Sequence, residues 1–276
     1  MRKMTRKTRL TRRNFEQTLQ VAQLAAMEAG DFALEQFTRV HVLQEKPMST
    51  DEVTWVDIEC EKRIVKILKK NFPKDSILTE ERKLPKTQKK DMWWVDPLDG
   101  SVSYFFGIPY WGISLALIQG GKPQVGVLYF PQTRDLYWAI RGGGAWRNYR
   151  KIAVSSIKKV VDGIIGIDYG YRTEREVGVL DVTRKVIDRV KYAVTYACTI
   201  GAIALVAEGK LAGYIHHMAR RFDLAAGSLL VMEAGGTVSD TAGKPVDWQD
   251  TKPFHFVVTN GRIHTEFLNI LKDPYR

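Results

Sequence analysis

Apolar and polar residues follow two different periods along the chain. Apolar side chains, many of them alanine, recur every three or four residues between Asn14 and Thr38, which predicts a long amphipathic helix with a packing face of small residues. A second helix is predicted from Asp57 to Phe72, where Pro73 ends it. Beyond this point most apolar residues stand in short runs, which are typical of strands. The pattern therefore predicts a pair of helices followed by a region rich in strands.

The segment from 112 to 154 consists of short apolar runs separated by tight turns. The runs at 113–118, 125–130 and 136–139 are joined by turns that contain Gly or Pro. Strands with such short connections pair as hairpins, so an antiparallel meander is expected. The three glycines at 142–144 lack the Lys-Ser/Thr pair that ends a P-loop motif, and we interpret them as a structural turn.

The second half of the chain alternates between strand and helix patterns. Strands are predicted at 164–167, 193–196 and 212–216, and helices at 174–190, at 201–208 and from Asp223 onward. This alternation predicts an α/β fold. We expect one domain over residues 14–276, with an N-terminal half at 14–155 and a C-terminal half at 156–276, preceded by a basic tail at 1–13.

The 276-residue chain has a net charge of +11, and its basic residues are concentrated at the start. Seven of the first thirteen residues are Lys or Arg, and none is acidic. Such a tail can contact nucleic acid, act as a targeting arm, or be a solvated and disordered start. We favour the last interpretation, because no aromatic residues stand between the basic ones to stack on bases.

Composition argues against several classes of protein. No apolar run approaches the ~20 residues that a membrane-spanning helix needs, and no signal-peptide segment follows the basic start, so a soluble, cytoplasmic protein is expected. Cys60 and Cys198 lie far apart without a CxxC pair, which indicates packed, reduced thiols rather than a disulfide framework or a zinc site.

Two carboxylates follow the apolar run that begins at Trp93. Asp96 and Asp99 are separated by Pro-Leu, and Gly100 and Ser101 come directly after them. Two carboxylates this close repel each other unless a cation lies between them. The residues after Asp99 are predicted to begin a helix or turn whose free amides can bind phosphate. The stretch therefore predicts a site for a metal ion and a phosphate group, with a plain surface turn as the alternative.

Three further acids stand at the ends of predicted elements. Glu80 ends the apolar run that begins at Ser76, so its carboxylate would converge with that of Asp96 if the two strands were neighbours. Hard oxygen ligands of this kind suit Mg²⁺. Asp57 and Asp223 stand in the first turns of helices, where each taken alone is explained by the favourable position of an acid at a helix N-terminus.

Together these motifs resemble the inositol monophosphatase family. That family belongs to a superfamily of Mg²⁺-dependent, lithium-sensitive phosphatases, which also contains fructose-1,6-bisphosphatases and phosphoadenosine-phosphate phosphatases. The resemblance runs from about residue 15 to the end, and its motifs stand at 51–57, 80–81, 96–101, 223–227 and 233–236.

The resemblance implies a layered αβαβα sandwich, a homodimer, and two to three Mg²⁺ ions per site. Glu80, Asp96 and the backbone carbonyl of Leu98 would hold the first ion. Asp96, Asp99 and Asp223 would hold the second. A third, more weakly bound ion would be held by Glu80 and water, which makes Glu80 a candidate catalytic residue as well as a metal ligand.

The resemblance also implies how the reaction would proceed. Asp57 would pair with Ser101, and the two would polarise the attacking water. The amides of Gly100 and Ser101 would cradle the phosphate of a small phosphorylated substrate. Metal-activated water makes a covalent enzyme intermediate unnecessary.

Two departures from the family pattern bear on the substrate. Ser101 stands where the family usually has Thr, which keeps the hydroxyl but removes the methyl that fixes its rotamer. His216 stands where inositol monophosphatases usually carry an acid that hydrogen-bonds substrate hydroxyls. A protonated imidazole would favour an anionic group, so a second phosphate or carboxylate on the substrate, helped by Arg220 and Arg221, is left open.

We expect Mg²⁺-dependent hydrolysis of inositol monophosphate or a related sugar phosphate. The alternatives within enzymes are a 3′-phosphoadenosine 5′-phosphate phosphatase and a fructose-1,6-bisphosphatase. The alternative of another class is a nucleic-acid-associated regulatory protein that keeps the fold and uses its basic tail.

Overall fold

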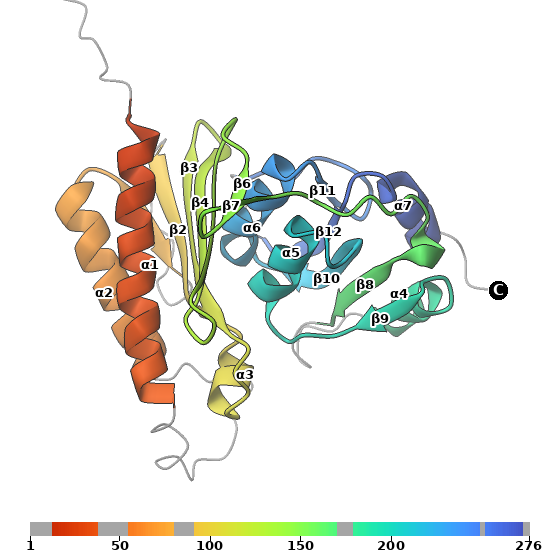
Figure 1. Cartoon of the computed structure of the whole chain (residues 1–276), viewed down its shortest axis with the longest axis horizontal. Coiled ribbons are helices and arrows are strands. Elements are labelled where there is room, and N and C mark those ends of the chain that lie inside the picture. Colours follow the sequence, from red (N-terminus) through yellow and green to blue (C-terminus); the bar gives the residue numbers. More distant parts are fainter. Residues whose placement is uncertain (1–12, 38–54, 80–90, 170–178, 249–251, 273–276) are drawn as a thin grey trace, which may run out of the picture.

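The described residues of the computed structural model form five layers (Figure 1). The description covers residues 13–37, 55–79, 91–169, 179–248 and 252–272. From left to right in Figure 1 the layers are a helix pair, a first sheet, a second helix pair, a second sheet and two outer helices. The predicted α/β class, with its αβαβα order of layers, is confirmed.

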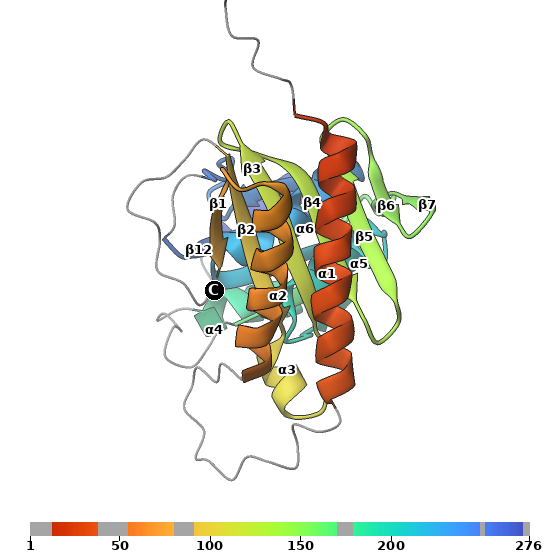
Figure 2. The same ribbon diagram turned by 90° about the vertical axis from the view of Figure 1, so that its left-hand side faces the viewer.

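The first sheet is covered on its outer side by α1 (Phe15–Phe37) and α2 (Trp55–Asn71), which lie side by side across it (Figure 2). Within the described residues the strand order of this sheet is β1-β2-β3-β4-β5-β6-β7. β1 is parallel to β2, and the other pairs are antiparallel. The strands are β1 (Ser76–Thr79), β2 (Asp91–Asp99), β3 (Gly112–Gln119), β4 (Lys122–Phe130), β5 (Asp135–Ile140), β6 (Ala145–Arg147) and β7 (Arg150–Ile152). The predicted meander is confirmed.

The second sheet of the described chain has the strand order β11-β12-β10-β8-β9. β10 is parallel to β8, which is parallel to β9, while β12 is antiparallel to its neighbours β10 and β11. The strands are β8 (Ile164–Asp168), β9 (Tyr192–Val194), β10 (Gly213–Ala219), β11 (Thr237–Asp240) and β12 (Phe254–Thr259). The remaining helices are α3 (Ser101–Phe105), α4 (Val179–Ile187), α5 (Thr199–Ala207), α6 (Arg221–Glu233), α7 (His264–Lys272) and the short η2 (Val160–Asp162).

Most predicted elements lie where the pattern placed them, with differences in the second half. The helix predicted at 174–190 is found as α4, which ends three residues earlier; part of its predicted start falls on residues 170–178, outside the described residues. The strand predicted at 193–196 lies one residue earlier and is shorter, as β9. The elements β11, β12 and α7 were not predicted.

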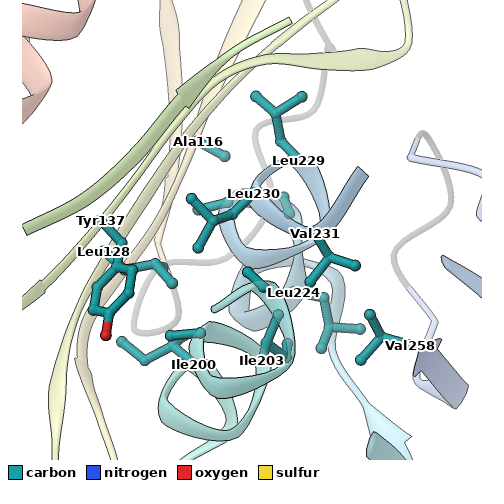
Figure 3. Close-up of a cluster of buried hydrophobic side chains, with 14 of the residues drawn as sticks. Ala116, Leu128, Tyr137, Ile200, Ile203, Leu224, Leu229, Leu230, Val231 and Val258 are labelled. Atoms are coloured by element: carbon teal, nitrogen blue, oxygen red, sulfur yellow. The ribbon is translucent and has the colours of Figure 1, made fainter. Parts of the chain in front are cut away.

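The largest apolar core lies between the two sheets and is built around α5 and α6 (Figure 3). Leu224 and Leu230 of α6 and Ile203 of α5 are fully or almost fully buried there. The sequences of both helices are apolar on nearly every face, as expected for helices enclosed between two sheets. A second core joins α1 and α2 to the first sheet, and a third joins α4 and α7 to the second.

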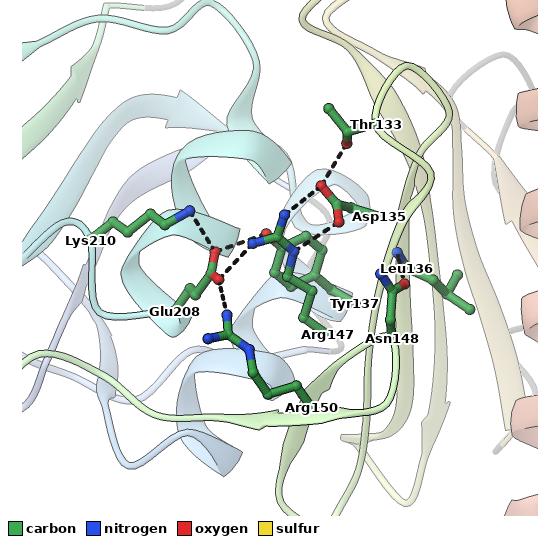
Figure 4. A network of polar contacts seen from close by, with 9 residues as sticks. All are labelled: Thr133, Asp135, Leu136, Tyr137, Arg147, Asn148, Arg150, Glu208 and Lys210. Atoms are coloured by element: carbon green, nitrogen blue, oxygen red, sulfur yellow. Dashed lines mark hydrogen bonds and ion pairs between the residues drawn. The ribbon is translucent and has the colours of Figure 1, made fainter.

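A polar network ties the meander to the middle layer (Figure 4). Glu208, directly after α5, has a nearly buried side chain that pairs with Arg147, Arg150 and Lys210. Arg147 also forms a two-pronged ion pair with Asp135, with both N–O distances 2.8 Å. Burial alone would raise the pKa of Glu208, but its hydrogen bonds to Arg147 and Lys210 outweigh that effect and lower it. The network fixes the β6–β7 hairpin against α5.

The triple-glycine turn binds a carboxylate of the protein itself. The amides of Gly142 and Gly144 donate to the two oxygens of Glu233, at 2.8 and 2.9 Å. Both glycines have positive φ, which a side chain would disfavour. The interpretation of this segment as a structural turn is confirmed.

Arg13, the last residue of the predicted basic tail, packs on the folded part of the chain. Its guanidinium lies 2.7 Å from a carboxylate oxygen of Asp75 and 4.3 Å from the ring centre of Phe72. Residues 1–12 lie outside the described residues, so the prediction of a disordered tail is untested for them.

Candidate functional site

A β-bulge near the end of β2 turns Asp96 and Asp99 to the same face of the first sheet. In an unbroken strand, residues three apart point to opposite faces. Asp96 pairs with Ser114 and Asp99 with Gly112, so three steps on β2 match two steps on β3. The extra residue shifts the alternation by one. Both carboxylates are therefore directed toward the middle layer, and both are buried.

Asp99 is held at the N-terminus of α5. One of its oxygens, Oδ2, accepts a hydrogen bond from the amide of Ile200 at 2.9 Å and from the thiol of Cys198 at 3.0 Å. Burial raises the pKa of Asp99 to about 6; the hydrogen bonds from Cys198 and Ile200 limit the rise, and the charge of Asp168 adds to it. Burial and the Asp99 charge also raise the pKa of Cys198, which keeps the thiol protonated as a donor. Asp99 thus caps the N-terminus of α5, independently of any role as a metal ligand.

Ser101 lies between the Asp96–Asp99 bulge and α2. Its hydroxyl donates to the carbonyl oxygen of Leu98 at 2.8 Å and lies 3.4 Å from Oδ1 of Asp57. A hydroxyl has one proton and can serve only one acceptor at a time. Asp57, in the first turn of α2, is buried and has come close to Ser101 although 44 residues separate them. The predicted Asp57–Ser101 pair is thus present as a long contact.

Gly100 makes the sharp turn from β2 into α3. Its φ of 85° is in the left-handed region, and a Cβ there would lie 3.0 Å from the carbonyl oxygen of Tyr110. Only glycine meets both conditions without strain. The predicted helix start after Asp99 is confirmed by α3, which begins at Ser101.

The remaining predicted ligands are Asp223 and Glu80. Asp223 is half-buried in the first turn of α6, whose N-cap is Arg220. Glu80 lies outside the described residues. β1 and β2 are parallel neighbours in register as far as Thr79 and Val95, so the expected adjacency of these strands is confirmed. Within the described ranges, which leave out Glu80, no three His, Cys, Asp or Glu side chains are grouped closely enough to hold a metal ion.

The donor set nevertheless fits a hard cation in its chemistry. Asp96 and Asp99 are buried carboxylates on one face, and the Leu98 carbonyl between them adds a third oxygen. The donors to Asp99, a thiol and backbone amides, carry no charge to balance it. Buried carboxylates are stabilised by cations, and oxygen ligands are those that Mg²⁺ prefers.

His216 lies on the facing sheet, beside an acid that the sequence analysis did not single out. On the parallel strands β8 and β10, Asp168 and His216 are in register, and their side chains approach to 3.9 Å. Tyr214, two residues before His216, packs in the core between the sheets, so His216 faces the middle layer too. The carboxylates of β2 and the Asp168–His216 pair therefore border the same layer from opposite sides.

Asp168, Cys198 and the Ile200 amide belong to this region but were missed from the sequence. Asp168 could have been found, because it ends the apolar run Ile164–Ile167 just as Asp96 ends its own run. Cys198 and the amide of Ile200 carry no such local signal, since they meet Asp99 only through the packing of α5 on the first sheet.

A neighbouring histidine is predicted to make the protein less stable in acid. His217 is buried, and burial together with the charges of His255 and His216 lowers its pKa to about 4. The unfolded chain takes up this proton near pH 6.5, so stability falls as the pH drops from about 6.5 to 4. At pH 4.5 we expect a loss of about 2–3 kcal/mol relative to pH 7 from this residue.

Urea unfolding at pH 7 and pH 4.5 measures this effect in the wild type and in His217→Leu. Acidic and basic groups that do not interact with His217 contribute equally to both proteins, so the informative quantity is the difference between the two losses. The variant should lose less stability than the wild type. Equal losses would contradict the assignment of a neutral, buried His217.

Comparison with known proteins identifies a family model and several relatives that match nearly the whole chain. The family model described as inositol monophosphatase family matches residues 14–273. A fructose-1,6-bisphosphatase/inositol-1-monophosphatase from Aquifex aeolicus is 30% identical and aligns over 94% of this chain and 97% of its own. A protein named Nus factor SuhB from Xylella fastidiosa is 35% identical, over 83% of each chain. The structure of inositol monophosphatase from Anabaena is 28% identical and superposes with a TM-score of 0.83, covering 94% of this chain and 97% of that one.

Proposed function

Because the chain belongs to the inositol monophosphatase family, we propose that it hydrolyses a small phosphate monoester, inositol monophosphate or a related sugar phosphate, in a Mg²⁺-dependent reaction. The observation that carries this proposal is the bulge in β2, which turns Asp96 and Asp99 to one buried face beside Ser101. A strand without the bulge would direct one of these two carboxylates away from the middle layer.

The residues that would hold Mg²⁺ are Glu80, Asp96, the Leu98 carbonyl, Asp99 and Asp223. Bound ions of this kind supply positive charge for the phosphoryl oxygens and lower the pKa of a water molecule. We infer two to three ions per site from the family resemblance, and with them sensitivity to lithium.

Asp57 and Ser101 would handle the proton of the attacking water. The Ser101 hydroxyl can accept a hydrogen bond from water while donating its own proton to Asp57. Asp57 lies 3.4 Å away, within reach of a small rotation about the Ser101 side chain. Asp57 is buried, whereas Ser101 is partly exposed, so water can reach the pair from the Ser101 side. Water oriented by such a pair is better placed for attack.

Gly100 and Ser101 would bind the phosphate through their backbone amides. They stand at the N-terminal end of α3, where amides are directed away from the helix and attract anions. Gly100 adds no side chain that would hinder a phosphate from approaching its backbone.

The test is phosphate release from a panel of inositol-1-phosphate, fructose-1,6-bisphosphate, phosphoadenosine phosphate and histidinol phosphate. Each is assayed with Mg²⁺, with EDTA, and with Mg²⁺ plus Li⁺. We expect release from a polyol monophosphate that depends on Mg²⁺ and is reduced by Li⁺. If no substrate gives metal-dependent release, the proposed activity is wrong.

A regulatory role in contact with nucleic acid is a second candidate, favoured by a relative that is named Nus factor SuhB and by the basic residues at the start of this chain. Deletion of residues 1–12 tests it and keeps Arg13, which is paired with Asp75. Loss of RNA binding with hydrolysis intact would support this role, and a full-length protein that binds no RNA would exclude it. The same preparations show by light scattering whether the protein is the homodimer that we infer from the family.

Among the helices of the described residues, none has both the length and the hydropathy that a membrane span requires.

A further inference from the structure

The pair formed by Asp168 and His216 borders the candidate site on the side opposite Asp96 and Asp99. The two side chains are 17% and 12% exposed, so both are largely enclosed yet reachable. The ring centre of His216 lies 6.2 Å from that of Tyr214, and Tyr214 belongs to the same buried cluster as Cys198, the thiol donor to Asp99. The charge of Asp168 also raises the pKa of Asp99. A substrate whose phosphate lies near Asp99 would therefore extend toward this pair.

The hydrogen bonding of His216 fixes which ring nitrogen faces Asp168. Nδ1 lies 2.8 Å from the backbone carbonyl oxygen of His217, which can only accept a hydrogen bond, so Nδ1 carries a proton. Nε2 faces Asp168, at 3.9 Å from Oδ1. With a neutral ring the pair has a net charge of −1, and with a protonated ring its net charge is zero. In neither state does it present the net positive charge that would attract a second anion.

Arg221 does not supply that positive charge either. Its guanidinium donates to the backbone carbonyl of Asp247 at 2.6 Å and to that of Lys252, and it lies 4.4 Å from the ring centre of Phe254. The residue is also buried. These contacts commit Arg221 to holding the chain before β12. Of the three residues that the sequence analysis considered for binding a second anion, His216, Arg220 and Arg221, this leaves Arg220.

The carboxylate of Asp168 is suited instead to hydroxyl groups. A carboxylate oxygen accepts hydrogen bonds from hydroxyls, and Nε2 of a neutral His216 is a second acceptor 3.9 Å away. Two acceptors at this separation match neighbouring hydroxyls on one ring or chain. In the family pattern an acid at position 216 binds substrate hydroxyls. Here that role would fall to Asp168, which is in register with His216 on the adjacent strand.

We propose that Asp168 determines substrate specificity by binding, with His216, the hydroxyls of a polyol monophosphate, and that it disfavours substrates with a second phosphate or a carboxylate at that end. This inference rests on the proposed phosphatase activity and names the substrate class for the same site. The charge on Asp168 repels a second anion, whereas its oxygens bind a hydroxyl by a charge-assisted hydrogen bond.

The experiment compares kcat/KM for inositol-1-phosphate and fructose-1,6-bisphosphate in the wild type and in Asp168→Asn. The variant keeps the size of the side chain but removes its charge. The amide oxygen of asparagine can still accept a hydrogen bond, but the bond is no longer charge-assisted, and the repulsion of a second phosphate is removed. The two effects act in the same direction on the ratio and together are worth roughly tenfold or more. We expect the ratio of monophosphate to bisphosphate activity to fall by at least about tenfold, chiefly through a higher KM for the monophosphate. Asp162→Asn, an exposed change of the same charge outside the site, is the matched control and should leave the ratio as in the wild type.

A second variant, His216→Gln, separates the two interpretations of the pair. If His216 helps to bind hydroxyls, the loss falls on inositol-1-phosphate. A loss confined to fructose-1,6-bisphosphate would show that His216 binds a second anion and would overturn the proposal. The proposal would also be overturned if a folded Asp168→Asn variant kept the wild-type ratio of monophosphate to bisphosphate activity. A wild-type protein that prefers the bisphosphate would overturn it as well. If the wild type hydrolyses none of the panel, the proposed function itself has failed, and this inference fails with it.

Discussion

Replacing Asp99 by Asn is expected to abolish metal-dependent phosphate release while the protein remains folded. The change removes one charge from a set of carboxylates that would hold Mg²⁺, and metal assistance supplies several kcal/mol of stabilisation to the transition state. A loss on the order of 10³-fold in kcat/KM or more follows, since each 1.4 kcal/mol is a factor of ten.

The fold should tolerate this change because of how Asp99 is held. The side-chain oxygen of asparagine can still accept hydrogen bonds from the Ile200 amide and the Cys198 thiol, which lie 2.9 and 3.0 Å from the carboxylate. The neutral amide also removes the cost of burying a charge. The melting temperature in EDTA should therefore be equal to that of the wild type or higher. A variant that merely unfolded would instead melt at a lower temperature.

Three measurements on Asp99→Asn and on the control Asp162→Asn complete the test. They are phosphate release, titration calorimetry with Mg²⁺, and thermal melting in EDTA. The control should match the wild type in all three. A folded Asp99→Asn protein with wild-type turnover would show that Asp99 only caps α5 and holds no metal.

Replacing Gly126 by Val is expected to destabilise the protein by about 3 kcal/mol and to weaken Mg²⁺ binding as well. Gly126 lies in the middle of β4, paired with Ala116 and Ala139, so the surface under α6 is flat at this point. A Cβ on Gly126 would lie 2.9 Å from the carbonyl oxygen of Ala226 and 3.0 Å from its Cα. Because both atoms belong to the backbone of α6, the helix itself has to move.

Movement of α6 links this packing contact to the candidate site. Asp223 stands in the first turn of the same helix, three residues before Ala226. If α6 moves away from the sheet, Asp223 moves away from Asp96 and Asp99. These three residues are the proposed ligands of one Mg²⁺ ion, so Mg²⁺ binding should weaken. Urea unfolding gives the loss of stability, and titration with Mg²⁺ gives the loss of affinity.

Two further glycine variants show whether the loss of stability and of Mg²⁺ affinity depends on the size of the side chain at position 126. Gly126→Ala should give a smaller loss of the same two quantities. Gly120→Ala, at a turn where a Cβ meets nothing within 4 Å, should cost only the roughly 1 kcal/mol of its left-handed backbone and leave Mg²⁺ binding intact. Wild-type stability in Gly126→Val would mean that α6 does not rest on β4 as described.

The elements of the first half were predictable because their signals are local. Periodicity placed α1 and α2, and short turns with Gly and Pro placed the meander. In the second half the helices α5 and α6 were predicted, although they are apolar on nearly all faces and carry little periodic signal. The end of α4 and the bounds of β9 were placed less accurately, and α7 was not predicted. The strands β11 and β12 stand after the last motif and were not assigned.

The sequence by itself determined the elements of the first half, the family resemblance, and the acids that end predicted strands or begin predicted helices. It also contained one sign of the bulge, since Pro97 between Asp96 and Asp99 cannot continue a regular strand ladder.

Only the tertiary structure decided which of these side chains face one another. The register of β2 on β3 turns Asp99 inward, the packing of α5 brings Cys198 and the Ile200 amide to it, and the pairing of β8 with β10 sets Asp168 beside His216. The physical reason is that strand register and helix packing join residues that are 13 to 101 positions apart in these examples. A local pattern of apolar and polar residues does not specify such pairings.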